Sequence, residues 1–189
     1  MASSGPKSAR GLAGSATAFH LVTGSADETV AWGRHIGRCL GCCLTPGLAV
    51  ALHGDLGAGK TTLVRGIVAG AGSRDRVTSP TFTFVNEYRT PAGWTIYHVD
   101  GYRLGEQAAG PDAAGLEAAT IGLDELLGDP AAVVLVEWAE RVAAWLPPDH
   151  LSIALAALPG APDARRIACT ATGNAPARVL ACAASAQGQ

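Results

Sequence analysis

Residues 54–62 have the residue types and the spacing that phosphate binding requires. They read Gly-Asp-Leu-Gly-Ala-Gly-Lys-Thr-Thr and fit the P-loop pattern G-x-x-x-x-G-K-[ST]. Glycines allow backbone N–H groups to approach phosphate oxygens closely. Lys60 adds a compact positive charge for the β- and γ-phosphates, and the Thr61 hydroxyl has the position that ligates Mg²⁺ in such loops. The segment predicts a site for a nucleoside triphosphate and Mg²⁺.

The scarcity of lysine strengthens this interpretation of Lys60. The chain has 14 basic residues, of which only Lys7 and Lys60 are lysines. Arginine is planar and forked, so it would not replace an ammonium equivalently in a phosphate cradle. The one lysine that the pattern demands is therefore present in a chain that otherwise uses arginine.

Two carboxylates follow apolar segments that have the character of buried strands. Asp100 ends the segment 94–100, and Glu137 ends the segment 133–137. A P-loop enzyme places acidic groups at the ends of strands next to the loop, where they hold Mg²⁺ or orient the attacking water. The spacing alone leaves open which of Asp100 and Glu137 has which role.

Other residues near these segments have weaker signals. Thr81, in Ser79-Pro-Thr, either senses the γ-phosphate as a switch threonine or only shapes a turn. Trp138 is expected in the core rather than stacked on a base or a partner, and His98 is expected to be structural. We expect Arg103 to pair with a local carboxylate rather than with phosphate.

The elements that must position these residues indicate an α/β fold. We predict a P-loop domain with a central, mostly parallel sheet flanked by helices and antiparallel additions. Residues 1–18 are predicted to be a disordered tail, 19–173 a single P-loop domain, and 174–189 a frayed C-terminal tail. Predicted strands lie at 19–22, 48–53, 82–89, 94–99, 132–137, 151–158 and 165–172. Predicted helices lie at about 25–41, 60–70, 123–127 and 139–145, and residues 105–120 are ambiguous.

Charge and hydropathy exclude several classes of protein. No apolar run approaches the roughly 18–20 residues that span a bilayer. Residues 1–10 lack the apolar segment of a secretory signal. A net charge of −2 with scattered arginines argues against a large nucleic-acid-binding face. These observations predict a cytoplasmic protein without a membrane partner.

The five cysteines do not suggest a disulfide framework, because their number is odd. Cys39, Cys42 and Cys43 lie close together in the sequence, but no second Cys/His pair stands at a familiar metal-site spacing. We therefore predict buried or partly buried free thiols in a reducing cytoplasm.

Four sequence blocks, taken together, resemble one family. The first is the P-loop, and the other three are Ser79-Pro-Thr-Phe-Thr83, His98-Val-Asp-Gly-Tyr-Arg-Leu104 and Val136-Glu-Trp-Ala-Glu-Arg141. The resemblance extends over about residues 20–158 and is to TsaE, also called the YjeE family, the small bacterial ATPase of tRNA threonylcarbamoyladenosine (t⁶A) biosynthesis. Beside the P-loop, the Glu-Trp block and the His-x-Asp-x-Tyr-Arg-Leu block make the resemblance specific.

This resemblance implies an activity and partners. The family binds ATP and Mg²⁺, hydrolyses ATP weakly alone, and acts with TsaD and TsaB, which transfer a threonylcarbamoyl group to A37 of tRNA. It implies Mg²⁺ ligation by Thr61 and Glu137, and catalytic roles for Lys60, Asp100 and Thr81. It also implies that tRNA is reached only through the partners, which agrees with the charge. The implied phosphate-binding residues are Gly57, Ala58, Gly59, Lys60, Thr61 and Thr62.

Three alternatives remain at this point. A P-loop small-molecule kinase would usually need an arginine-bearing lid, and residues 105–119 contain no arginine. A GTP-dependent switch would need an Asn-Lys-x-Asp block, which is absent. A nucleotide-binding module without catalysis would bind ATP but not hydrolyse it, even with partners present.

Overall fold

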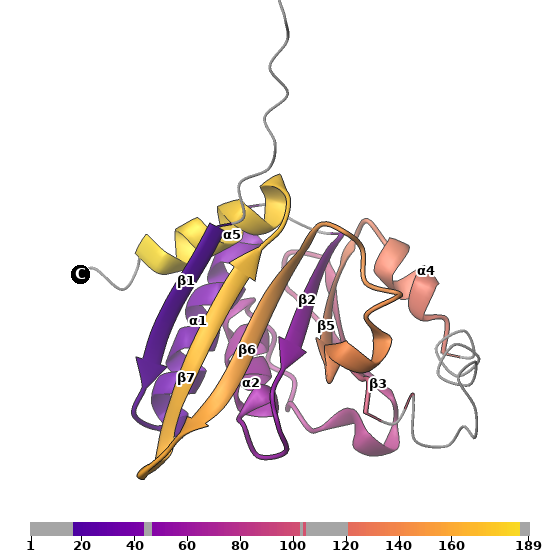
Figure 1. Ribbon diagram of the computed structural model, residues 1–189. Coiled ribbons are helices and arrows are strands. Elements are labelled where there is room, and N and C mark those ends of the chain that lie inside the picture. The colour runs from indigo at the N-terminus through magenta and orange to yellow at the C-terminus, as the bar shows by residue number, and fades with distance from the viewer. Residues whose placement is uncertain (1–16, 44–46, 103, 105–120, 186–189) are drawn as a thin grey trace, which may run out of the picture.

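The computed structural model describes residues 17–43, 47–102, 104 and 121–185, and the elements below refer to this part of the chain. Strands and helices alternate through the first half, and two long strands and a helix close the second half (Figure 1). The strands are β1 Thr17–Thr23, β2 Leu48–His53, β3 Val85–Arg89, β4 Thr95–Asp100, β5 Ala132–Glu137, β6 His150–Leu158 and β7 Ala161–Ala171. The α-helices are α1 Ala26–Cys42, α2 Lys60–Gly70, α4 Leu123–Gly128 and α5 Asn174–Ser185, and two 3-10 helices are η1 Pro80–Phe82 and η3 Ala139–Val142.

The seven described strands form one sheet in the order β1-β7-β6-β2-β5-β4-β3. The four central strands, β6, β2, β5 and β4, are parallel to one another. β3, β7 and β1 extend the sheet at its two sides by antiparallel pairing. The predicted fold class, a mostly parallel centre with antiparallel additions, is confirmed.

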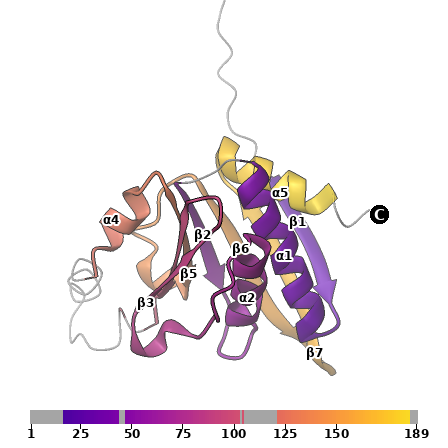
Figure 2. The same cartoon turned by 180° about the vertical axis from the view of Figure 1, so that it is seen from behind.

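Helices cover the sheet unequally. α1, α2 and α5 pack on one face, and Figure 2 shows α1 and α2 crossing in front of the strands from that side. The apolar residues of β2 alternate between this face and the opposite one, where α4 and η3 cover β4 and β5. Burial on both faces explains why β2 and β5 read as continuous apolar runs rather than as alternating patterns.

Helix α1 begins where the capping pattern predicts. The Ser25 hydroxyl accepts a hydrogen bond from the Glu28 amide at 3.1 Å, and the Glu28 carboxylate accepts one from the Gly24 amide at 2.7 Å. Further along, α1 crosses α2 at backbone contact. A Cβ added at Gly37 would lie 2.1 Å from the Ile67 carbonyl oxygen. α1 thereby fixes the position of the helix that follows the P-loop.

Some predicted elements were wrong in extent or type. The helix predicted at 139–145 is only the 3-10 helix η3, since the left-handed Trp138 (φ 56°) precedes it and Pro147 and Pro148 follow. Phe82 belongs to η1 rather than to a strand, and β1 begins at Thr17. The antiparallel β3–β4 hairpin is confirmed.

Residues 174–185 correct the expectation of a frayed C-terminal tail. They form α5, which buries four side chains on one face at helical spacing. Residues 1–16, 105–120 and 186–189 lie outside the described residues, so the division of the chain into tail and domain stays a prediction. The buried residues of α5 are Pro176, Val179, Leu180 and Ala183.

The expectation of free thiols is wrong for two of the five cysteines. Cys39 of α1 and Cys182 of α5 form a disulfide, whereas Cys42, Cys43 and Cys169 are free. No short-range pattern signals this pair, because 143 positions of sequence separate its members. In the described part of the chain, no helix is long and apolar enough to cross a membrane.

Candidate functional site

The P-loop lies at the carboxyl edge of the parallel strands, between β2 and α2. Gly54, directly after β2, has φ 133°, and a Cβ there would lie 2.3 Å from the Leu155 carbonyl oxygen of β6. Gly59, the residue before α2, has φ 101°. Both positions lie in the left-handed region that favours glycine, so the glycines of the motif are needed for the path of the backbone.

Lys60 opens helix α2 and turns back over the loop. Its Nζ donates hydrogen bonds to the carbonyl oxygens of Gly54 and Asp55, and it lies 3.6 Å from the centre of the Trp138 ring. Only 5 % of Lys60 is exposed, and this burial lowers its pKa, against the opposing charge of Glu137. The loop therefore holds one buried ammonium where phosphate oxygens would lie.

Thr61 and Glu137 meet because β2 and β5 are neighbours. The Thr61 hydroxyl donates a hydrogen bond to Glu137 Oε1 at 2.7 Å. His98 Nε2 lies 2.8 Å from the same oxygen, and His98 is fully buried. His98 is thus structural, as predicted, and it positions the carboxylate. A hydroxyl and a carboxylate at one point are the hard oxygen donors that suit Mg²⁺.

Asp100 and Thr81 face the same pocket as the loop. Asp100 is paired in register with Glu137 at the ends of β4 and β5, and its Oδ1 accepts a hydrogen bond from the Tyr102 amide at 3.0 Å. Thr81, in η1, has its hydroxyl 2.8 Å from that of Ser79. The pocket measures ≈ 230 Å³, and its lining residues include Gly57, Ala58, Gly59, Lys60, Thr61, Thr62, Thr81, Asp100 and Glu137. The structure thus brings together every residue that the sequence predicted for the site.

Trp138 is not the core residue that we expected. It is half-buried and lines both the P-loop pocket and an adjoining, more apolar pocket of ≈ 250 Å³. Its ring lies 4.9 Å from that of Tyr102, centre to centre. Among the described non-glycine residues, only Trp138 and Phe84 have positive φ. Trp138 directly follows β5, and Phe84 lies two residues after η1 and packs against the core on the α4 side of the sheet. Arg103 lies outside the described residues.

Arg165, on β7, contacts the P-loop and was not predicted. Its Nε donates to the Ala58 carbonyl oxygen at 3.0 Å and its Nη2 to the Gly57 carbonyl oxygen at 3.2 Å. In a trans peptide the C=O and N–H groups point in opposite directions. Because the Ala58 C=O points toward Arg165, the N–H of Gly59 in the same peptide group points away from it. Arg165 is 107 positions from Ala58, and only the sheet order brings the two together.

Comparison with known proteins adds the family to this geometry. The sequence profile of the family described as "Threonylcarbamoyl adenosine biosynthesis protein TsaE" matches residues 23–167. The chain belongs to the TsaE family. The protein named tRNA threonylcarbamoyladenosine biosynthesis protein TsaE in Treponema pallidum is 39% identical over 141 residues, which are 74% of this chain and 93% of that protein. The protein of the same name in Streptomyces coelicolor is 38% identical over 144 residues, 75% of this chain and 91% of that protein.

A solved structure is similar to this fold along almost the whole chain. The crystal structure of Bacillus subtilis YdiB superposes with a TM-score of 0.69 at 28% sequence identity, and the match covers 92% of this chain and 98% of YdiB. The family match over residues 23–167 and the curated relatives confirm the resemblance seen in the four sequence blocks as family membership.

Proposed function

We propose that this chain is a Mg²⁺-dependent ATPase that supports formation of t⁶A at A37 of tRNA together with TsaB and TsaD. The chain belongs to a family described as a threonylcarbamoyl adenosine biosynthesis protein, which supports a role in t⁶A formation. The observation that carries the ATPase is the contact of the P-loop hydroxyl of Thr61 with the strand-end carboxylate of Glu137, at 2.7 Å and beside the buried Lys60.

The residues around the pocket divide the work of hydrolysis. In the proposed reaction, water attacks the γ-phosphate in line with the leaving β-phosphate oxygen. The Lys60 ammonium and the backbone amides of the loop stabilise the charge that develops on the phosphate oxygens. Asp100, buried at the end of β4, orients the attacking water, and Thr81 closes the pocket from η1. Mg²⁺, when bound by Thr61 and Glu137, supplies further positive charge to the phosphates.

Exposed apolar side chains at the pocket mouth support a role for partner proteins. Leu56, in the P-loop, is 91% exposed and lines both pockets. Phe82, next to Thr81, is 86% exposed. Contiguous exposed apolar patches mark protein contacts, and we propose that these two side chains belong to one such patch. We propose that TsaB or TsaD covers this rim, so that hydrolysis depends on assembly.

We also propose that tRNA is reached only through these partners, in the cytoplasm. A chain that gripped tRNA alone would carry a basic stripe, and the net charge here is −2. A gel-shift titration of the isolated chain with tRNA is expected to show little binding. Tight, salt-sensitive binding would contradict indirect access.

The decisive test measures t⁶A over several turnovers. TsaB, TsaD, ATP, tRNA and the threonylcarbamoyl donor are combined with the wild-type chain, with the Lys60→Ala variant, or without either. We expect repeated product formation only with the wild-type chain. A product yield that does not depend on the chain would refute the proposed role.

A magnesium titration tests the proposed Mg²⁺ ligand. Glu137→Gln keeps the shape of the side chain but removes its charge, and we expect the Mg²⁺ concentration for half-maximal hydrolysis to rise about tenfold. Glu140→Gln is the matched control, because Glu140 is exposed and contacts His53 rather than Thr61. Equal titrations for wild type and Glu137→Gln would remove Glu137 from the proposed ligands.

A further inference from the structure

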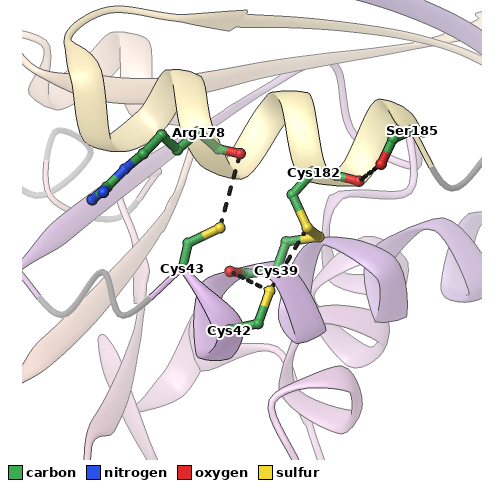
Figure 3. The surroundings of a disulfide bond; sticks show 6 residues. All are labelled: Cys39, Cys42, Cys43, Arg178, Cys182 and Ser185. Carbon is green, nitrogen blue, oxygen red and sulfur yellow. Dashed lines mark hydrogen bonds between the residues drawn. A yellow bond between two sulfur atoms is a disulfide. The ribbon is translucent and has the colours of Figure 1, made fainter.

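Three cysteines meet where the last turn of α1 packs against α5. Cys39 and Cys182 form the disulfide, and the sulfur atoms of Cys39, Cys42 and Cys182 lie within 4.8 Å of one another (Figure 3). Neither the family assignment nor the proposed ATPase accounts for this cluster. It lies at the end of α1 that packs beside the carboxyl end of α2, whereas the P-loop precedes the amino end of α2.

The third thiol is placed to react with the disulfide. Cys42 Sγ lies 3.7 Å from the half-buried Cys182 Sγ, so the two sulfur atoms are in van der Waals contact. Cys39 and Cys42 are three positions apart on α1, so both project from the same side of that helix toward α5. The three sulfur atoms form a triangle rather than a line, so attack along the axis of the disulfide requires rotation of the Cys42 side chain about its own bonds. After that rotation Cys182 can bond to either sulfur.

Exposure separates the two possible partners of Cys182. Cys39 is 5% exposed, whereas Cys42 is exposed. A thiol from solution must reach a sulfur atom in order to open a disulfide, and access is one of the factors that set the rate. A Cys42–Cys182 disulfide would contain the exposed sulfur of Cys42, which an external thiol can attack. The Cys39–Cys182 disulfide contains the buried sulfur of Cys39 instead.

The two other free thiols do not share this position. Cys43 Sγ lies against the Arg178 carbonyl oxygen at 3.9 Å, and burial raises its pKa, which keeps it a thiol. Cys169 is fully buried in β7, where burial raises its pKa to about 12. The chain thus contains an exposed thiol next to the disulfide and, for comparison, the half-buried thiol of Cys43 and the buried thiol of Cys169.

We propose that Cys39, Cys42 and Cys182 form a thiol–disulfide exchange site, in which Cys42 relays the bond from the buried Cys39 to the surface. The Cys42 thiolate attacks Cys182 Sγ, a Cys42–Cys182 bond forms, and the Cys39–Cys182 bond breaks. Cys39 leaves with the electron pair and takes up the proton that Cys42 lost. This step neither oxidises nor reduces the protein as a whole.

A small thiol such as glutathione completes the reaction. Its thiolate attacks Cys42 Sγ, forms a mixed disulfide there and releases Cys182 as a thiolate. A second glutathione then attacks the mixed disulfide, which yields glutathione disulfide and the Cys42 thiol. Two glutathiones are oxidised and one protein disulfide is reduced, so the electrons balance. The cytoplasmic location proposed above favours such a site, because disulfides in reducing compartments are mostly redox-active rather than structural.

Mapping the linkage tests the exchange step directly. The oxidised full-length chain is alkylated, digested with trypsin without reductant and analysed by tandem mass spectrometry. Trypsin leaves Cys39, Cys42 and Cys43 in one peptide, 39–60, and Cys182 in another, 179–189, so backbone fragmentation between Leu40 and Cys42 must assign the bond. We expect both Cys39–Cys182 and Cys42–Cys182 forms. Absence of the second form at every pH from 7 to 9 would overturn the proposal.

The rate of opening tests the relay. Glutathione is added to the oxidised chain, and alkylation follows the appearance of free Cys182. We expect Cys42→Ser to slow opening by about tenfold or more, because glutathione must then attack the buried Cys39 or the half-buried Cys182 directly. Cys43→Ser is the matched control and is expected to open at the wild-type rate.

Three results would overturn the proposal in this second experiment. They are an unchanged rate in Cys42→Ser, an equal slowing in Cys43→Ser, and retention of one zinc ion per chain by the reduced protein with no disulfide formed on oxidation. Neither experiment contains nucleotide or tRNA. Their failure would therefore leave the proposed ATPase untouched, and failure of the ATPase would leave the exchange site untouched.

Discussion

The two ends of helix α2 contrast in chemistry and in how the sequence specifies them. At the amino end, a contiguous loop and two strand-end carboxylates gather an ammonium, a hydroxyl and hard oxygen atoms. Beside the carboxyl end, α1 and α5 gather soft sulfur atoms from residues 143 positions apart. The first end depends on local motifs and strand register, and the second depends on how two helices pack. One short helix of 11 residues, about 16 Å long, separates the two proposed sites.

Reduction of the Cys39–Cys182 disulfide tests whether this bond stabilises the fold without affecting ATP binding at the P-loop. Opening a covalent loop of this size releases conformational entropy in the unfolded chain, worth about 3–5 kcal/mol. We expect the thermal midpoint to fall by roughly 10 °C in reductant, with the ATP dissociation constant unchanged. Calorimetry and a nucleotide titration measure both. Cys182→Ser, which removes the cysteine common to both possible bonds, should not respond to reductant. A reductant-sensitive ATP affinity in the wild type would break the contrast between the two ends.

Removing the buried ammonium tests the first end alone. Lys60→Ala deletes the charge that the loop holds toward phosphate, and we expect partner-stimulated ATP hydrolysis to fall about 10²–10³-fold, roughly 3–4 kcal/mol. Arg65→Ala removes an exposed charge from the same helix and should retain activity. Steady-state phosphate release in the presence of TsaB and TsaD is the measurement. Hydrolysis by Lys60→Ala at the wild-type rate would be incompatible with the proposed role of the loop.

The close crossing of α1 and α2 lies between the two ends of α2. Adding one methyl group at Gly66 tests how much this crossing contributes to stability. A Cβ at Gly66 would lie 2.2 Å from the Val30 carbonyl oxygen, so Gly66→Ala must separate the helices. We expect a loss of about 2–3 kcal/mol in the free energy of unfolding by urea titration. Gly41→Ala, on α1 with nothing within 4 Å of the added Cβ, should be neutral or slightly stabilising. Equal effects would show that the close crossing is not needed.

The smallest expected effect comes from Arg165, and it tests whether the P-loop motif alone specifies the amino end of α2. Arg165→Ala removes the two hydrogen bonds to the Gly57 and Ala58 carbonyl oxygens from outside the motif. We expect the ATP dissociation constant to rise about tenfold, roughly 1.4 kcal/mol, by calorimetric titration. The neighbouring Arg166 is exposed, and Arg166→Ala should bind ATP as the wild type does. An unchanged affinity in Arg165→Ala would mean that the motif alone holds the loop.

Local patterns were sufficient where the chemistry depends on adjacent residues or on a strand's last position. The P-loop sequence fixed β2, the loop and the start of α2, and apolar runs ending in Asp100 and Glu137 led to β4 and β5. Parallel register then brought those two carboxylates together, as a P-loop protein requires. The fold class and the residues that line the pocket could therefore be predicted.

Other features needed the tertiary structure. No property of Arg165 in the sequence separates it from the neighbouring Arg166, and the Cys39–Cys182 pair depends on how α5 packs on α1. α5 itself was missed because its alanine-rich sequence resembles a tail, although Pro176, Val179 and Leu180 have helical spacing. Trp138 was expected in the core, but its backbone is left-handed and its side chain lines the pocket.

The Cys39–Cys182 bond also has a topological consequence. It closes a covalent ring that contains β2 to β7, and with them the P-loop, Asp100 and Glu137. A single proteolytic cut anywhere inside that ring would linearise it without dividing the molecule. The oxidised chain would therefore migrate as one piece on a gel after nicking, and only reductant would release two fragments.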